Sequence, residues 1–401
     1  MRLGAALLPA LAAAGLVCFA VFAGVRAEPL DPTLPLHFSV GNPAGPAPME
    51  GIDAARSGRA QAPLPRQPRV LWRARVPGTI DHSLLVDQRG SIVAVGSPPH
   101  LSQLDSRGRL EWSARLSAPP AAVVLTSDGS RLALGSGGQL TAFDAKGKLS
   151  RKQTLGLPGA SVLAAPLPLD DGGLLAALGG AVLRLDASGE IVARSVVDDD
   201  VRSVLRDGAT LLLVTVRGDV LEWKPPHRPA PRGSFGGKID GAALSAPGRL
   251  IAVVDRTRLI ELKLATGTRH VRIPDGPLVL RGPPAITPSG TSRVASIDGL
   301  LLGHDATGRE TLRVALEPTA ITLGDAGVAA AQTRSAPSLL TDGEGSVGFV
   351  RAGLDAGVVN AEGEIKSAAG AACSDPIALA PAGPRRMLVA CRSGLIWAIG
   401  D

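Results

Sequence analysis

A unit of about forty residues repeats along most of the chain, and it limits the folds that the chain can adopt. Each copy contains an apolar run that ends in Asp-x-x-Gly or a degraded form of this pattern. The marker residues are separated by 39, 42, 38, 40, 41, 55 and 41 positions, and they are residues 105, 144, 186, 224, 264, 305, 360 and 401. Such a period is typical of solenoids, propellers and arrays. The chain therefore has eight units, and the long interval predicts an insertion within 325–348.

Each unit contains three or four short apolar runs separated by turn residues. In the second unit, the runs 121–125, 131–134 and 140–143 are mostly apolar, and the run 149–155 is more polar. Strands buried on both faces are expected to be apolar throughout, whereas an edge strand is expected to be polar. Four strands in forty residues is the pattern of a propeller blade. We predict an all-β fold, an eight-bladed β-propeller, with seven blades as the alternative if the seventh unit forms no sheet of its own.

The two ends of the repeat region complement each other. The eighth unit stops at Asp401 without a fourth run, and the first unit is preceded by an extra run at 70–76. This extra run aligns with 111–116, and both contain Trp, Ala and Arg at matching places. An open array would leave two sheet edges without caps. We therefore expect residues 70–76 to complete the last blade, so that residues 69–401 form one propeller domain.

Residues 1–27 are predicted to be a targeting segment. Met1-Arg2 is basic, residues 5–25 are apolar and uncharged, and Val25-Arg26-Ala27 resembles a signal-peptidase site. An uncleaved run of this length is also long enough to anchor the chain in a membrane. Either alternative places the rest of the chain outside the cytoplasm. We expect the protein to be periplasmic or extracellular, or anchored in the inner membrane.

Two other features complete the N-terminal region. Cys18 is preceded by Gly15 and Val17, which do not form a lipidation signal, so we do not expect a lipoprotein. Residues 28–68 are rich in Pro, Ala, Gly and Arg and show no sustained periodicity. This composition predicts a tether between the targeting segment and the propeller.

The charge pattern limits the partners. The chain has 42 basic and 36 acidic residues, and the basic residues are mostly single arginines rather than a patch. It has six Phe, four Trp and no Tyr, which provides little for stacking on bases. We expect no nucleic-acid binding, a monomer, envelope or secreted proteins as partners, and membrane contact only through the N-terminal segment.

The run Leu-Asp-Ser-Arg-Gly-Arg-Leu-Glu-Trp at 104–112 resembles the repeat of the pyrroloquinoline-quinone-like, or quinoprotein-type, β-propeller family. The resemblance covers residues 70–401. This family includes quinone-dependent dehydrogenases and non-catalytic members such as the outer-membrane barrel-assembly lipoprotein. The dehydrogenases hold the quinone against an adjacent Cys pair and a Trp floor, with Ca²⁺ on a carboxylate and an Asn. Here Cys373 and Cys391 lie 18 residues apart, and Asn occurs only at Asn42 and Asn360. The resemblance therefore implies a non-catalytic member.

No other catalytic, cofactor-binding or metal-binding motif occurs in the sequence. The six His show no HExxH spacing, and neither GxSxG nor a phosphate-binding GxxxxGK[ST] is present. We predict no catalytic residue, no metal ligand and no cofactor. Cys373 and Cys391 bracket the first hairpin of the eighth unit, and they form either a disulfide or two buried thiols.

Four aspartates occupy similar places in different units. Asp81, Asp200, Asp240 and Asp375 stand just before the first strand of their units, and His82 follows the first of them. First strands line the central channel of a propeller, so these carboxylates are expected at one mouth of the channel. They could form an acidic rim that binds a cation or a basic segment. The alternative is that each Asp accepts hydrogen bonds from nearby backbone N–H groups.

These observations favour a non-catalytic, extracytoplasmic propeller that binds proteins or supports assembly of the bacterial cell envelope. One alternative is a periplasmic oxidoreductase that uses pyrroloquinoline quinone with Ca²⁺. Another is a sensor that binds a small molecule or cation at the channel mouth.

Overall fold

The computed structural model describes residues 47, 49, 52–53, 56–126, 128–135, 137–157, 161–316, 339–351, 355–371 and 373–401. The predicted targeting segment at 1–27 lies outside these residues. The described part of the chain contains strands and no helix, and so it has no helix that is long and apolar enough to cross a membrane.

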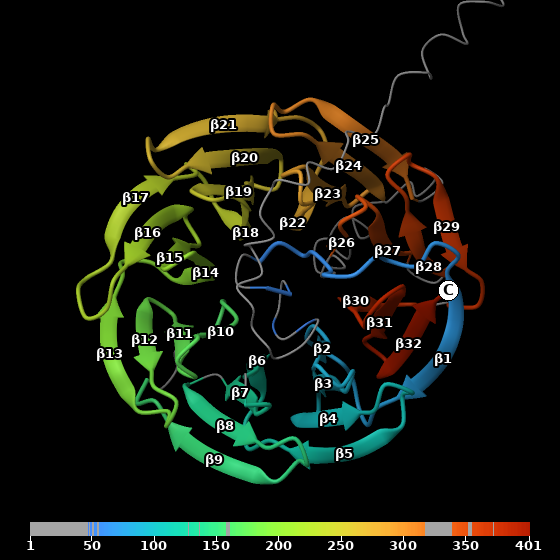
Figure 1. Cartoon of the computed structure of the whole chain (residues 1–401). Helices are drawn as coiled ribbons and strands as arrows, with labels where there is room; N and C mark the ends of the chain where they lie inside the picture. Colours follow the sequence, from blue (N-terminus) through green and yellow to red (C-terminus); the bar gives the residue numbers. More distant parts are fainter. Residues whose placement is uncertain are drawn as a thin grey trace, which may run out of the picture.

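Within the described ranges, eight four-stranded antiparallel sheets form a ring around a central axis, as Figure 1 shows. The first two blades contain β2 (Leu85–Val86), β3 (Ile92–Gly96), β4 (His100–Leu104) and β5 (Leu110–Arg115), then β6 (Pro120–Leu125), β7 (Arg131–Gly135), β8 (Gln139–Phe143) and β9 (Leu149–Thr154). The third and fourth contain β10 (Leu167–Pro168), β11 (Leu174–Leu178), β12 (Ala181–Leu185) and β13 (Ile191–Val196), then β14 (Val201–Asp207), β15 (Thr210–Thr215), β16 (Asp219–Trp223) and β17 (Ala230–Ser234). The fifth and sixth contain β18 (Ile239–Ala246), β19 (Arg249–Val254), β20 (Arg258–Lys263) and β21 (Thr268–Ile273), then β22 (Leu280–Ile286), β23 (Ser292–Ser296), β24 (Leu300–His304) and β25 (Glu310–Ala315). The seventh contains β26 (Leu340–Thr341), β27 (Val347–Arg351), β28 (Asp355–Val359) and β29 (Ile365–Ala368), and the eighth contains β30 (Pro376–Pro381), β31 (Arg386–Cys391), β32 (Leu395–Gly400) and β1 (Arg69–Arg75).

The predicted eight-bladed propeller is therefore confirmed, and the alternative of seven blades is wrong because the seventh unit forms its own sheet. The extra residues of this unit lie before β26, in the first part of the predicted range 325–348 or just ahead of it. The turn between β26 and β27, at residues 342–346, has the same five-residue length as the turn at 87–91 in the first blade. The added length thus falls between Ala315 and Leu340, largely in residues 317–338, which lie outside the described residues.

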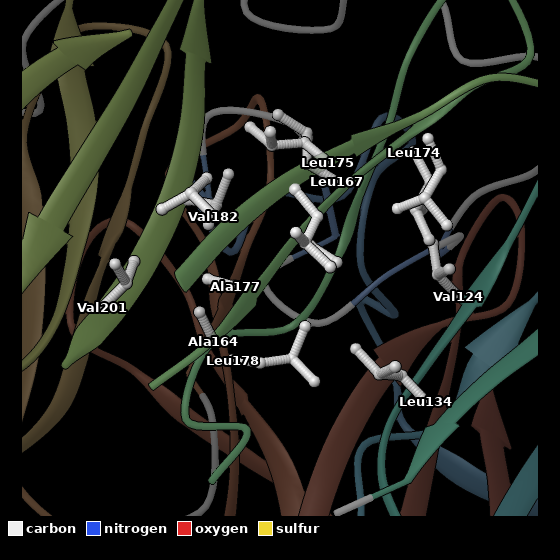
Figure 2. Packing of buried hydrophobic residues seen from close by; sticks show 14 of the residues in the cluster. Val124, Leu134, Ala164, Leu167, Leu174, Leu175, Ala177, Leu178, Val182 and Val201 are labelled. Atoms are coloured by element: carbon white, nitrogen blue, oxygen red, sulfur yellow. The ribbon is translucent and has the colours of Figure 1, made fainter. Parts of the chain in front are cut away.

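Burial follows the position of each strand within its blade. Every residue of β3 and β7 is buried, whereas exposed and half-buried residues alternate along β5 and β9. The inner strands are covered on both faces because each blade packs face to face against its neighbours. Figure 2 shows one such core, where side chains of the second, third and fourth blades meet. Burial of each large aliphatic side chain contributes about 1.5–3 kcal/mol, so the cores between blades hold the ring together.

The ring closes through the N-terminal strand. β1 pairs antiparallel with β32, from Arg69 opposite Gly400 to Arg75 opposite Leu395, with one irregularity between Val70 and Trp72. In Figure 1 the two strands lie side by side although they come from opposite ends of the chain. The prediction that residues 70–76 complete the last blade is confirmed.

The Asp-x-x-Gly pattern forms the turn between the third and fourth strands. In the first blade, Asp105 Oδ1 accepts hydrogen bonds from the N–H groups of Arg107 and Arg109, and Gly108 adopts a φ of 80°. This conformation favours glycine. In the second blade the N–H group of Lys148 holds the pKa of Asp144 below its ordinary value. The repeat marker is therefore a local turn motif, and this explains why Asp and Gly recur at 105, 144, 186 and 305 and at 108, 147, 189 and 308.

The Trp that follows the marker connects neighbouring blades. Trp112 of β5 lies over Gly147 of the second blade, and its Nε1 donates a hydrogen bond to Ala145 O at 3.2 Å. Trp72 of β1 contacts Gly108 in the same way. A Cβ atom at Gly147 would lie 2.5 Å from the ring of Trp112, so only glycine leaves room for it. We call the interface between two neighbouring blades, which this contact covers on its outer side, a joint.

Candidate functional site

Two of the four predicted rim aspartates lie together. Asp81 precedes β2 and Asp375 precedes β30, and both contact Arg392 in the turn between β31 and β32. Arg392 Nε lies 2.7 Å from Asp375 Oδ2, and its Nη1 lies 3.2 Å from Asp81 Oδ1. The guanidinium thus joins the eighth blade to the first. All three side chains are partly exposed, so each ion pair is expected to contribute less than about 1 kcal/mol.

The other predicted rim residues make separate contacts. Asp240 is the second residue of β18, and its Oδ2 lies 3.3 Å from Arg256 Nε. The carbonyl oxygen of Asp200 accepts a hydrogen bond from the N–H group of Val216. His82 Nε2 lies 2.9 Å from Pro120 O, which ties the first blade to the second.

Two arginines therefore lie among these carboxylates. Arg392 and Arg256 lie within ion-pair distance of three of the four aspartates. In the described ranges, no group of three or more His, Cys, Asp or Glu side chains is placed to hold a metal ion. An acidic rim that binds a cation or a basic segment stays a prediction, and three of its four carboxylates already have a cationic neighbour.

The channel itself contains a segment that the sequence did not reveal. The described residues of 47–66, here called the arm, lie within the ring against the first strands of the blades, as Figure 1 shows. Ala47 pairs with Val86 of β2, and Arg59 pairs with Thr341 of β26. Most of its described residues are buried, and these are Ala47, Met49, Ile52, Arg56, Ser57, Arg59, Ala60, Leu64 and Pro65. The C-terminal part of the predicted tether therefore contacts the propeller.

Arg56 extends from the arm to the far side of the channel. Its Nη2 donates hydrogen bonds to Ala165 O at 2.6 Å and Pro166 O at 3.3 Å, and its Nε donates to Val204 O at 3.3 Å. The side chain is 7% exposed. Because these carbonyl oxygens belong to the third and fourth blades, a single guanidinium connects them to the arm.

The arm leaves the channel over the seventh and eighth blades. The N–H group of Leu64 donates to Asp342 Oδ2 at 2.8 Å, and the N–H group of Arg385 donates to Pro63 O at 2.7 Å. Asp342 is fully buried and also accepts the N–H groups of Glu344 and Ser346. One carboxylate thus holds both the turn of the seventh blade and the arm.

Burial raises the pKa of Asp342 above its ordinary value of 3.8, despite the N–H groups that favour the charged form. The folded protein therefore takes up a proton more readily at this site than the unfolded chain does. The stability that this proton provides is fully present below pH 3.8 and is lost as the pH rises through the folded pKa.

We expect the stability of the wild type, relative to Asp342→Asn, to increase as the pH falls from about 7 to about 4, because Asn does not titrate. Thermal unfolding of both proteins over this range measures the difference. A difference that is constant with pH, or that shrinks on acidification, would contradict the prediction.

Cys373 and Cys391 form a disulfide in the structure, with Cα atoms 5.7 Å apart. Cys391 ends β31 and Cys373 precedes β30, so the bond staples the first hairpin of the eighth blade. Both residues are almost fully buried. This blade also receives β1, so the disulfide lies within the sheet that closes the ring.

Replacing both cysteines with serine is expected to lower the free energy of unfolding by about 3 kcal/mol, because the bond closes a loop of 18 residues. Thermal unfolding with and without a reductant measures this. The reductant should lower the Tm of the wild type toward that of the double variant and leave the variant unchanged. An equal Tm for both oxidised proteins would show that the bond does not stabilise the blade.

The family model described as "Outer membrane protein assembly factor BamB" matches residues 56–273, which is more than half of the 401 residues. The chain belongs to the BamB family. The matched region begins at Arg56, so it includes the second half of the arm as well as the first five blades. The resemblance to the quinoprotein-type repeat, and to its non-catalytic members, is confirmed.

Solved structures share the fold at low sequence identity. BamB from Moraxella catarrhalis has a TM-score of 0.62 and 16% identity, and the match covers 83% of this chain and 98% of that chain. The computationally designed Ika8 protein has a TM-score of 0.65 and 11% identity, with 83% and 100% covered. The C-terminal WD40 domain of Sif2 has a TM-score of 0.51 and 13% identity, with 80% and 81% covered. No curated protein sequence matches the chain significantly. These likenesses show the propeller fold alone, and membership of the BamB family rests on the sequence match.

Proposed function

We propose that this protein is a non-catalytic, extracytoplasmic scaffold that binds other proteins during assembly of the outer membrane. The observation that carries the proposal is the family match, since the family description names an outer membrane protein assembly factor. Its partners would be envelope proteins, and its predicted signal or anchor at 1–27 would deliver it to the periplasm. The proposal includes no cofactor and no catalytic residue.

The architecture suits this role for a physical reason. The ring is closed by β1, stapled by the disulfide between Cys373 and Cys391, and braced inside by the arm. Turns from eight blades cover both ends of the ring. A rigid frame that presents many loops binds a partner without losing much conformational freedom, and this lowers the entropic cost of association.

Complementation tests the proposal. The full chain is produced in a bacterium whose own BamB-family protein has been deleted, and the amount of folded outer-membrane barrel protein is measured. We expect the full chain to restore it, and a chain without residues 1–27 to remain in the cytoplasm and fail. Fractionation must show the full chain in the envelope. A full chain that reaches the envelope in normal amount and restores nothing would contradict the proposed role.

A further inference from the structure

The joint between the first and second blades is filled by a set of polar side chains around Arg131. This residue is 1% exposed, its Nη2 lies 2.7 Å from Asp87 Oδ2, and its Nε donates to Gln103 Oε1 at 2.8 Å. Its Nη1 donates to Gly129 O, and Trp112 covers the joint from the outer strand. The guanidinium thus comes from the second blade and is held by Asp87 and Gln103 of the first blade and by Gly129 O of its own blade.

The next joint, between the second and third blades, has shorter side chains at the equivalent positions. Strand register establishes the equivalence: Gln103 pairs with Trp112, and Ala142 pairs with Arg151. Three side chains of the first joint have shorter equivalents in the second. Arg131 is replaced by Leu174, Asp87 by Thr126, and Gln103 by Ala142. Figure 2 shows Leu174 of β11 beside Val124 of β6, across this joint.

The shorter side chains leave an open crevice of about 190 Å³. Its floor is apolar and buried, and it is formed by Leu132, Leu140, Ala142, Leu174 and Leu185. Sites for small-molecule ligands and cofactors usually have volumes of about 300–1,000 Å³. A cavity of about 150 Å³ holds one benzene ring. The crevice is therefore the size of a single side chain, not of a cofactor.

The mouth of the crevice carries a net negative charge. Asp128 and Asp186 are its two carboxylates, and Arg151 is its one cation. Arg151 Nη2 lies 3.2 Å from Ala187 O, at the place where Trp112 contacts Ala145 O in the preceding joint. A cationic side chain with an apolar stem would bring the mouth to neutrality and cover the leucines of the floor.

We propose that the crevice between the second and third blades binds an arginine side chain of a partner polypeptide. Arg131 shows within this same molecule that the space between two blades can hold a guanidinium. In the second joint Thr126 and Ala142 replace its acceptors Asp87 and Gln103, so Asp128 and Asp186 at the mouth would supply the counter-charge. The third blade supplies Leu174 there instead, so the cation has to come from outside. The inference rests on the proposed function as a protein-binding scaffold and names one anchor point on its surface.

Methyl NMR of the full-length chain, labelled at its leucine methyl groups, tests the proposal. Leu132, Leu140, Leu174 and Leu185 line the crevice and report on its occupancy. The probe is the capped tripeptide acetyl-Gly-Arg-Gly-amide, for which we expect a Kd of about 1 mM, as is typical of a single side chain. The same peptide with citrulline, a neutral analogue of arginine, is expected to bind at least about tenfold more weakly.

Two variants make the test specific. Thr126→Asp with Ala142→Gln and Leu174→Arg rebuilds the filled joint and should abolish the shifts of the remaining floor leucines. Asp128→Asn removes one negative charge from the mouth and should weaken binding of the arginine peptide several-fold. Because Asp128 also accepts hydrogen bonds from Thr126 and Ser130 within its turn, thermal unfolding of this variant must show that the fold is retained. Equal binding of the arginine and citrulline peptides, stronger binding of a phenylalanine peptide, or arginine binding that both variants retain would overturn the proposal.

The outcome is separable from the proposed function. Peptide binding at the crevice together with failed complementation would leave the site in place and refute the assembly role. Successful complementation by the filled variant, with normal barrel-protein levels, would show that assembly does not use this crevice, and it would refute the proposed anchor point but not the scaffold.

Discussion

A chain that begins at Pro77 and lacks β1 is expected to form aggregates instead of a folded monomer. Without β1, the backbone N–H and C=O groups of β32 that face β1 lose their partners along an apolar edge, Leu395–Gly400. Loss of five or so net-stabilising hydrogen bonds, at about 1 kcal/mol each, removes roughly 5 kcal/mol. That is as large as the total stability of many proteins. The exposed edge can then pair with the same edge of another copy.

A chain that begins at Gln67 is the matched control, since it lacks the arm and keeps β1. Size-exclusion chromatography and thermal unfolding compare the two truncated chains with the full one. We expect the chain from Gln67 to remain monomeric with a lowered Tm and the chain from Pro77 to elute in large assemblies. If the chain from Pro77 is monomeric and as stable as the control, β1 does not hold the ring closed.

Arg56→Ala is expected to release the arm from the channel and to lower the free energy of unfolding by roughly 3 kcal/mol. The guanidinium donates to three carbonyl oxygens at the centre of the ring, and hydrogen bonds to a charged group contribute about 1.5–3 kcal/mol. Removing it leaves Ala165 O, Pro166 O and Val204 O without this donor. Limited proteolysis should then cut within residues 47–66, while the blades stay resistant.

Arg66→Ala provides the control on the same arm. Arg66 lies at the surface, where its Nη2 is 2.8 Å from Glu344 Oε1 and its side chain is 60% exposed. Exposed ion pairs contribute about 1 kcal/mol or less, so this variant should keep the protease resistance of the wild type. Equal protease sensitivity of the two variants would show that Arg56 has no special part in holding the arm.

The fold could be predicted because the repeat determines it locally. The marker residues Asp105, Asp144, Asp186 and Asp305 accept N–H groups within four residues of themselves, so these turns depend only on nearby sequence. The alternation of burial along β5 is equally local. The closing strand could be found because Trp72 and Trp112 occupy equivalent places and make the same contact with the next blade.

The arm could not be predicted because its pairing has no period. It meets the ring through isolated bridges at Ala47 and Arg59 and through the long reach of Arg56, and none of these produces a repeating pattern of apolar residues. The acidic rim was predicted from the matching places of four aspartates in the repeat. The repeat alignment does not show that Arg392 contacts both Asp81 and Asp375. The change from Gln103 to Ala142 in the aligned units is visible in the sequence. Whether this change opens a crevice depends on the residues of the next blade that face it, and the sequence alone does not give these contacts.

The pairing of residue 69 with residue 400 also has a consequence for the order of folding. The strand that appears first during synthesis cannot find its partner until the last residues of the chain are available. Contacts between such distant residues are slow to form, because closing a long loop costs entropy before any contact offsets it. Until then both edges of the growing ring are exposed to other chains. We therefore expect the completed chain to close in a late, slow step, and this is the stage at which a chaperone would protect it.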